Sequence, residues 1–232
     1  MYHKLSTSLL AEFIGTFALI FIGAGAGALN AGLVAVAFAH GLVILCFAYA
    51  YGHISGTHIN PAVTLGVWAA GKIDAARAGS YIVFQIVGGI AGALTLRWVL
   101  GGTGTGLGLT QLAQNLSVHD TTITITPLVG MVLEAIMTFF LVNSVMNAGI
   151  SGKATIPGGL AIGLTVTFCI LMGGPLTGAS VNPARSIGPA VATGNFDNLW
   201  VYLVGPALGG IVAGLLYKTV FEEREAGRPR KK

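Results

Sequence analysis

Long stretches without a charged residue constrain this chain more than any other feature of its sequence. They separate four pairs of charged residues: Glu12 and Lys72, Arg77 and Arg97, Lys153 and Arg185, and Asp197 and Lys218. A membrane-spanning helix needs about 20 mainly apolar residues, and these stretches hold several such segments. Charged residues make up only 9% of the 232 residues, against about 25% in soluble domains. The sequence therefore predicts an all-α polytopic membrane protein and argues against a water-soluble enzyme.

Six segments are long enough to cross a membrane: residues 9–29, 33–51, 78–100, 128–148, 157–174 and 199–217. Two further apolar segments, which begin at Asn60 and Asn182, are too short to cross. The long connection over residues 101–127 is rich in Gly and Thr and is expected to be a flexible loop outside the membrane.

The placement of positive charge predicts the orientation of the chain. Six of the 12 Lys and Arg residues lie in the last fifteen positions: Lys218, Arg224, Arg228, Arg230, Lys231 and Lys232. With a cytoplasmic N-terminus, the inner segments hold ten cations and the outer segments only Arg97 and Arg185, which satisfies the positive-inside rule. Both termini are expected to be cytoplasmic, and the tail is interpreted as an orientation signal or lipid contact, not as a nucleic-acid site.

An internal repeat relates the two halves of the chain. Asn60-Pro61-Ala62 recurs 122 positions later as Asn182-Pro183-Ala184. The same offset pairs Glu12 with Glu134, Thr16 with Thr138, Gly56 with Gly178, Gly88 with Gly210 and Gly92 with Gly214. Each copy holds three spans, so the second copy must enter the membrane inverted. We expect one channel domain over residues 1–232, with repeat 1 at 6–100, repeat 2 at 128–219 and a tail at 220–232.

The two short segments are predicted to be half-helices that dip into the membrane from opposite faces. Asn at the N-cap and Pro at the first helical position favour a helix start. Ten residues from Pro61 span about 15 Å, half of a membrane core about 30 Å thick. Irregular backbone at that depth must be buried or must line a wet cavity. Residues 53–59 and 175–181 are therefore expected to line a pore or a binding site.

Asn60 and Asn182 can serve that pore chemically. Two helix N-termini aim their positive ends at one point, and each Asn adds a side-chain N–H donor. A water that accepts both bonds turns its hydrogens away from its neighbours, which interrupts proton transfer and repels cations. The simpler alternative is that each Asn only caps a helix. Arg185 follows the second motif, and a charge at this depth points to function by default. The alternative is an Arg whose side chain extends to the outer membrane interface.

The acids Glu12 and Glu134 lie inside predicted spans at equivalent positions of the two repeats. One interpretation is a proton relay, as in pumps. The other, which we favour, is that each carboxylate supports its own re-entrant loop by accepting backbone N–H bonds.

These residues carry a family resemblance. The segments from Gly52 to Thr64 (GHISGTHINPAVT) and from Ser180 to Ser186 (SVNPARS) resemble the signature loops of the aquaporin, or major intrinsic protein, family. The resemblance covers nearly the whole chain. It implies a right-handed bundle of six tilted helices and two half-helices, a pore in each subunit, a homotetramer, and no cofactor.

In that family four positions form a constriction, and they fall here on His40, Ile170, Ala179 and Arg185. The set resembles that of plant tonoplast aquaporins. Because Ile170 removes a polar wall and Ala179 takes little volume, we expect a wider filter that passes ammonia or hydrogen peroxide alongside water. Glycerol is less expected, because glycerol-conducting relatives usually carry Asp where Ser186 stands. His119 in the long loop is a candidate for the pore mouth, with an ordinary solvated histidine as the alternative. If His119 or His40 lines the mouth, its titration is expected to modulate conduction.

The leading hypothesis is a passive water channel in a multi-pass membrane protein that excludes protons and ions. One alternative is a channel mainly for ammonia or glycerol, and another is a coupled secondary transporter, because inverted repeats also build those. No nucleophile–base pair or metal-spaced cluster indicates an enzyme. The expected location is the plasma or inner membrane, or a vacuole-type membrane in a eukaryote.

Overall fold

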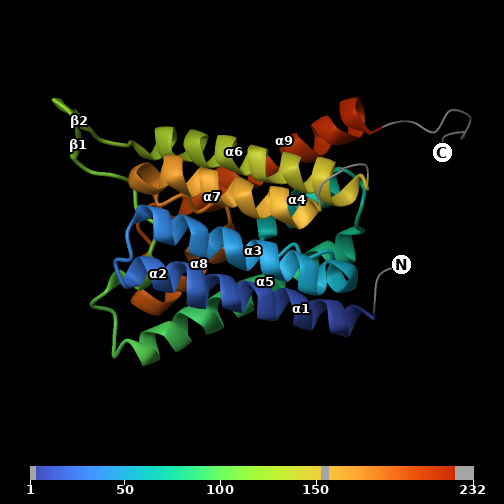
Figure 1. The fold of residues 1–232 in the computed structure, drawn as a ribbon, viewed down its shortest axis with the longest axis horizontal. Helices are drawn as coiled ribbons and strands as arrows, with labels where there is room; N and C mark the ends of the chain where they lie inside the picture. Colours follow the sequence, from blue (N-terminus) through green and yellow to red (C-terminus); the bar gives the residue numbers. More distant parts are fainter. Residues whose placement is uncertain (1–3, 153–156, 223–232) are drawn as a thin grey trace, which may run out of the picture.

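The computed structural model describes residues 4–152 and 157–222, and within these ranges six helices are long and apolar enough to cross a membrane. They run side by side in one bundle (Figure 1). Their bounds are α1 Leu5–Ala18 continued by η1 Leu19–Ala24 and α2 Gly25–Ala28, α3 Leu33–Ser55, α5 Ala75–Val99, α6 Pro127–Ser144 continued by η3 Val145–Ile150, α7 Gly158–Thr177, and α9 Leu199–Leu216 continued by η4 Tyr217–Phe221. The six predicted spans are confirmed, each with ends shifted by a few residues.

The two ends of the bundle differ. The start of α1 and the end of η4 lie at one end, which we call the terminal face (Figure 1). A two-stranded hairpin, β1 Leu116–Val118 paired with β2 Thr121–Ile123, projects from the other end, the hairpin face. The predicted inner cations Lys153, Arg224, Arg228, Arg230, Lys231 and Lys232 lie outside the described residues. The orientation of the bundle in a membrane therefore stays a prediction.

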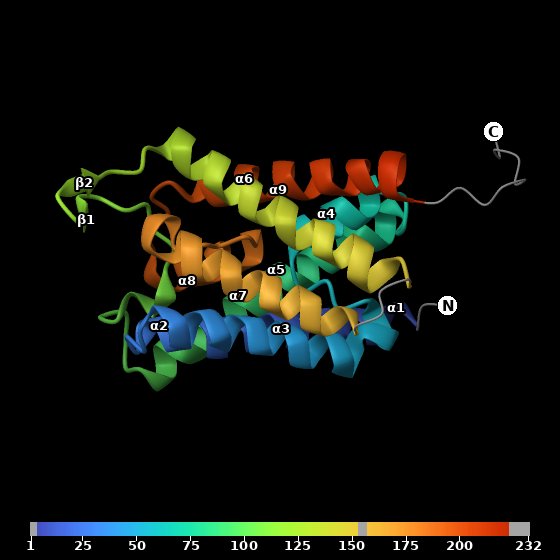
Figure 2. The same ribbon diagram turned by 45° about the horizontal axis from the view of Figure 1, so that its top comes forward.

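The two short segments are half-helices that begin where the sequence predicted. α4 is Pro61–Ala69 and α8 is Pro183–Thr193, each with Pro at its start. The Asn60 side chain accepts a bond from Ala62 N at 2.8 Å, and the Asn182 side chain accepts one from Ala184 N at 3.0 Å. α4 lies toward the terminal face and α8 toward the hairpin face (Figures 1 and 2). Their N-termini meet in the middle of the bundle.

Glycines bring each half-helix against the third span of the other repeat. A Cβ on Gly89 of α5 would lie 2.7 Å from the Ala184 carbonyl oxygen of α8. A Cβ on Gly210 of α9 would collide with the Ala62 carbonyl oxygen of α4. Small residues permit such backbone contact between membrane helices. The two repeats therefore interlock through their half-helices.

The offset of 122 does not hold in the third spans, so the predicted pairing of Gly88 with Gly210 is off by one position. Gly88 packs on the Phe13 carbonyl, and Gly209 packs on the equivalent Ala135 carbonyl. Gly89 and Gly210, 121 positions apart, likewise occupy equivalent places. The second repeat has one residue fewer than the first between its half-helix and its third span, and one residue corresponds to a rotation of about 100° around a helix. Each helix carries two adjacent glycines, Gly88-Gly89 and Gly209-Gly210. A fixed offset of 122 therefore still aligned glycine with glycine, and the slip was not visible in the sequence.

The connection over residues 101–126 is more ordered than the sequence predicted. It contains a short turn, η2 Gly106–Gly108, in which Leu107 is fully buried. Ala113 N donates to the Leu176 carbonyl at 2.8 Å, which ties the connection to the end of α7. The expectation of a flexible loop is therefore wrong for residues 107–113, because Leu107, Thr110 and Leu112 are buried and Ala113 is bonded to α7.

Candidate pore and its lining

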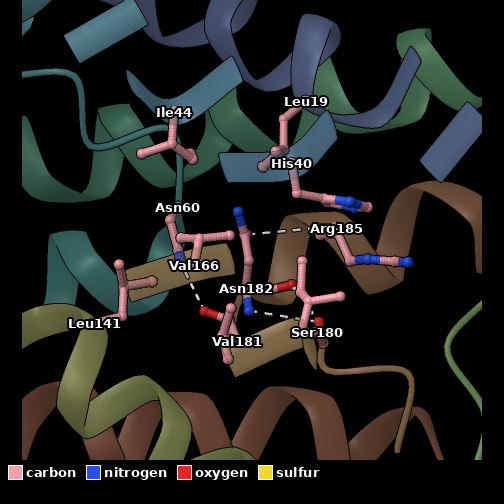
Figure 3. A pocket seen from close by; sticks show the side chains of 11 residues that line it. Leu19, His40, Ile44, Asn60, Leu141, Val166, Ser180, Val181, Asn182 and Arg185 are labelled. Carbon is pink, nitrogen blue, oxygen red and sulfur yellow. Dashed lines mark hydrogen bonds between the residues drawn. The ribbon is translucent and has the colours of Figure 1, made fainter. Parts of the chain in front are cut away.

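A cavity lies where the two half-helices meet (Figure 3). Both repeats contribute to its wall, which combines apolar side chains with a few polar groups. The lining residues are Leu19, His40, Ile44, Asn60, Leu141, Val166, Ile170, Ser180, Val181, Asn182 and Arg185.

The two asparagines bind the opposite re-entrant loop. Asn60 Nδ2 donates to the Val181 carbonyl at 2.8 Å, and Asn182 Nδ2 donates to the Ile59 carbonyl at 2.9 Å. The acceptor residues have positive φ values, 47° at Val181 and 39° at Ile59, a conformation that costs energy for β-branched side chains. An amide NH₂ group has two donors. Each Asn therefore keeps one N–H for a molecule in the cavity while its other polar groups are held.

Glu12 supports the first re-entrant loop. Its carboxylate accepts bonds from Ser55 Oγ at 2.6 Å, His58 N at 3.0 Å and Ile59 N at 2.5 Å. Gln85 of α5 adds a fourth donor, Nε2 at 2.7 Å. The sequence analysis did not single out Gln85, although a lone amide side chain in the middle of an apolar span is a usable signal.

Glu134 does the same for the second loop with three donors. These are Thr177 Oγ1 at 2.7 Å, Ser180 N at 2.9 Å and Val181 N at 2.7 Å. Both carboxylates are fully buried and neither lines the central cavity. This arrangement favours loop support over a proton relay.

His40 presents one nitrogen to the cavity. Its Nδ1 lies 2.9 Å from the Val36 carbonyl oxygen, which can only accept, so Nδ1 carries the proton. Its buried Nε2 has no partner among the described residues, and in the neutral ring this atom is an acceptor. Gly23 of η1 packs against the ring, where a Cβ would lie 2.6 Å from His40 Cδ2.

Arg185 lines the same cavity and carries hydrogen-bond donors. Its NH1 donates to the Gly108 carbonyl at 2.6 Å, and its Nε has no partner among the described residues. The other two predicted filter residues lie nearby: Ile170 lines the cavity, whereas Ala179 is buried beneath the surface with a φ of 42°. The structure thus brings an acceptor and fixed donors to one narrow place.

The cavity continues toward both faces. On the hairpin face a vestibule shares Ile170 and Arg185 with the central cavity, and its wall includes Thr105 and Gln111. On the terminal face a second vestibule shares Ile44 with it. The three cavities lie one after another along the bundle.

His119 is not brought to this path. It lies in the hairpin turn between β1 and β2, is exposed and does not line the vestibule on the hairpin face. Gln111 stands at the mouth instead. The sequence analysis did not single out Gln111.

Other candidate chemistry does not gather into a site. No group of three His, Cys, Asp or Glu in residues 4–152 and 157–222 has the arrangement of a metal site. His58 Nδ1 lies 3.1 Å from Thr64 Oγ1 in a buried network. Cys46 and Cys169 are both free cysteines.

Two inverted half-helices that meet inside six membrane spans, with three cavities in series between the faces, are the architecture of a membrane pore. The family model of the major intrinsic proteins matches residues 2–217. The chain therefore belongs to the major intrinsic protein family, whose members include the aquaporins.

Curated relatives agree along nearly the whole chain. Aquaporin TIP4-4 of Zea mays is 37% identical over 96% of this chain and 89% of its own length, and aquaporin TIP2-1 of Arabidopsis thaliana is 38% identical over 91% and 86%. Aquaporin Z of Rhodopseudomonas palustris is 39% identical over 92% and 93%. The crystal structure of the aquaglyceroporin from Plasmodium falciparum matches with a TM-score of 0.78 and 26% identity, over 94% of this chain and 97% of that chain. The protein is thus a passive membrane channel of the aquaporin family and not an enzyme.

Proposed function

We propose that this channel conducts water in single file and excludes protons and ions. The observation that carries the proposal is the pair of crossed amide bonds between Asn60 and Val181 and between Asn182 and Ile59. Because these bonds fix both amides, each offers one N–H donor at the same depth of the pore. A water that accepts both bonds cannot pass a proton to the next water.

Osmotic stopped-flow on proteoliposomes tests this proposal. Vesicles that hold the purified protein should shrink much faster than empty vesicles, with a low activation energy, after an osmotic step. A pH-sensitive dye inside the same vesicles should show no increase in proton flux. Shrinkage at the rate of empty vesicles would refute the proposal and favour a transporter, whose flux saturates with gradient.

Ammonia and hydrogen peroxide are proposed as additional permeants. His40 Nε2 is an acceptor, and Arg185 supplies donors beside it. Water, ammonia and hydrogen peroxide each donate and accept hydrogen bonds, and the apolar Ile170 leaves the remaining wall without a competing partner. Internal alkalinisation of vesicles in an ammonia gradient should therefore be faster with the protein than without it.

A channel mainly for glycerol is the second candidate. The solved relative titled an aquaglyceroporin favours it, whereas Ser186 departs from the Asp that glycerol-conducting relatives usually carry. The same vesicles distinguish the two, because a glycerol channel re-swells in a glycerol gradient and a strict water channel does not.

We also propose a homotetramer in a cell or vacuole-type membrane, with both termini cytoplasmic. The family resemblance supports the assembly, and the positive-inside charge count supports the orientation. Apolar side chains exposed on α3 and α7, such as Phe38, Leu42, Leu164 and Phe168, suit either lipid or another subunit. Native mass spectrometry from detergent tests the assembly, and protease access to the tail in sealed vesicles tests the orientation.

A further inference from the structure

Among the described residues, the guanidinium group of Arg185 is bound by a loop residue and not by a residue of a neighbouring helix. Its NH1 donates to the Gly108 carbonyl at 2.6 Å, and its side chain is only 6% exposed. Gly108 belongs to the connection between the repeats, and its φ of 67° allows it to lie against the Ala24 carbonyl, where a Cβ would collide. The position of the guanidinium therefore depends on how firmly this loop is attached.

A second attachment lies two residues further along the loop. The hydroxyl of Thr110 lies 2.7 Å from the hydroxyl of Ser186, which directly follows Arg185 in α8. Ser186 also lies 2.7 Å from Ser180 Oγ, and Ser180 Oγ donates to the Asn182 carbonyl at 2.8 Å. Thr110 is 2% exposed and Ser186 is fully buried, so solvent does not compete for these bonds.

The two attachments close a ring. Arg185 binds Gly108 through its side chain, and its neighbour Ser186 binds Thr110. The two bonds hold the short segment from Gly108 to Thr110 against α8 at both of its ends, and together they set the place and the direction of the Gly108 carbonyl. Gly178 makes room for this contact, because any Cβ there would lie 3.1 Å from Thr110 Cα.

The first repeat builds the same network differently. Thr64 and His58 occupy the places of Ser186 and Ser180, and Gln85 of α5 donates to Thr64 Oγ1 at 2.9 Å. The equivalent place on α9, 121 positions later, holds Pro206, which has no side-chain donor. In the second repeat Thr110 takes over the role of Gln85. In the second repeat the hydrogen-bond network therefore includes the loop whose Gly108 carbonyl binds Arg185.

We propose that Thr110 is a positioning residue of the selectivity filter, which acts on permeation through Gly108 and Arg185. This inference rests on the channel activity proposed above. Without the Thr110 hydroxyl the Gly108 carbonyl is no longer aimed at Arg185. The freed guanidinium then swings across the constriction, where it obstructs passage and must be reordered for each molecule.

The test compares Thr110→Val, which keeps the volume and removes the hydroxyl, with Thr110→Ser, which keeps the hydroxyl. The loss of a buried hydrogen bond should lower unit water permeability about fivefold in Thr110→Val and raise the activation energy. Thr110→Ser should restore both values. Thr122→Val, which makes the same chemical change in the exposed hairpin, is the matched control and should equal wild type.

A second background separates positioning from a general structural role. In Arg185→Ala vesicles, Thr110→Val should cause no further fall in permeability, because the group on which it acts is absent. A fall of the same size in that background would overturn the proposal, as would a Thr110→Val channel equal to wild type. If Thr110→Val fails to fold, Ser186→Ala removes the same bond from the other side. Failure of the proposed function is distinguishable, because then wild type itself does not exceed empty vesicles.

Discussion

Asn60 and Asn182 each donate their side-chain amide to the backbone carbonyl that precedes the other, at 2.8 Å to Val181 and 2.9 Å to Ile59. Each oxygen Oδ1 is also occupied, by Ala62 N in one case and Ala184 N in the other. The amides therefore cannot rotate without the loss of a cap and a cross-link together. This exchange makes the two half-helices one unit at the centre of the pore.

Replacement of the Asn182 amide by a carboxylate tests whether water conduction depends on the crossed amide bonds. Asn182→Asp removes the donor to Ile59 and places a carboxylate beside the Ile59 carbonyl oxygen, so water permeability should fall by an order of magnitude or more. Asn198→Asp, an exposed N-cap whose side chain makes no capping bond, is the control. Stopped-flow light scattering measures both. A channel with Asn182→Asp that conducts like wild type would contradict the role given to the crossed amides.

The two buried glutamates should differ in their effect on stability. Glu12→Gln disturbs four donors and Glu134→Gln disturbs three. Each buried donor left without an acceptor costs about 1–3 kcal/mol. Thermal unfolding in detergent should show a clear loss for both variants and a larger one for Glu12→Gln.

Glu222→Gln provides the comparison for these variants. It removes a partly exposed ion pair with Lys72, which is worth at most about 1 kcal/mol. If Glu12→Gln destabilises the protein no more than Glu222→Gln does, the loop-support role is wrong.

Two glycines on one helix should respond in opposite ways to alanine. Gly89→Ala places a Cβ 2.7 Å from the Ala184 carbonyl, and such overpacking costs about 1–3 kcal/mol. It should also shift α8 and lower permeability. Gly79→Ala has nothing within 4 Å of the new Cβ and should be neutral or stabilising by about 0.5–1 kcal/mol, because alanine favours helix. Equal effects of the two variants on unfolding would show that α5 and α8 are not in backbone contact.

Gly23 leaves the space in which the His40 ring lies, so a larger residue at this position should displace the ring. In Gly23→Ala the new Cβ meets His40 Cδ2 at 2.6 Å, so the ring must move into the constriction. Water permeability should fall severalfold for a displaced ring of this size. In a His40→Ala background the same change should have little effect, and an equally large fall there would place the action of Gly23 elsewhere.

His119 should not contribute to permeation. Since it lies in the exposed hairpin turn and outside the vestibule wall, His119→Ala should match wild type in permeability at each pH from about 5 to 8. Gln111→Ala, at the mouth itself, is the informative partner. A changed pH profile in His119→Ala would show that the hairpin folds over the pore.

Part of this protein was predictable because the deciding forces are local. Six spans follow from apolar length, and the starts of α4 and α8 follow from an Asn cap and a Pro that fit only the first turn of a helix. The inverted arrangement follows from three spans in each copy. Glu12 and Glu134 were expected near the loops because a buried carboxylate needs donors, and re-entrant backbone has donors to offer.

Tertiary structure alone decided which partners those groups chose. Gln85 reaches Glu12 across 73 positions of the chain, and the bonds from Arg185 to Gly108 and from Ser186 to Thr110 cross 77 and 76 positions. The one-residue slip appears only when Gly89 of α5 is compared with Gly210 of α9, 121 positions later. The choice of Gln111 over His119 at the mouth is of the same kind. Local sequence fixes which groups need a hydrogen bond. The packing of distant helices determines which group is close enough to make it.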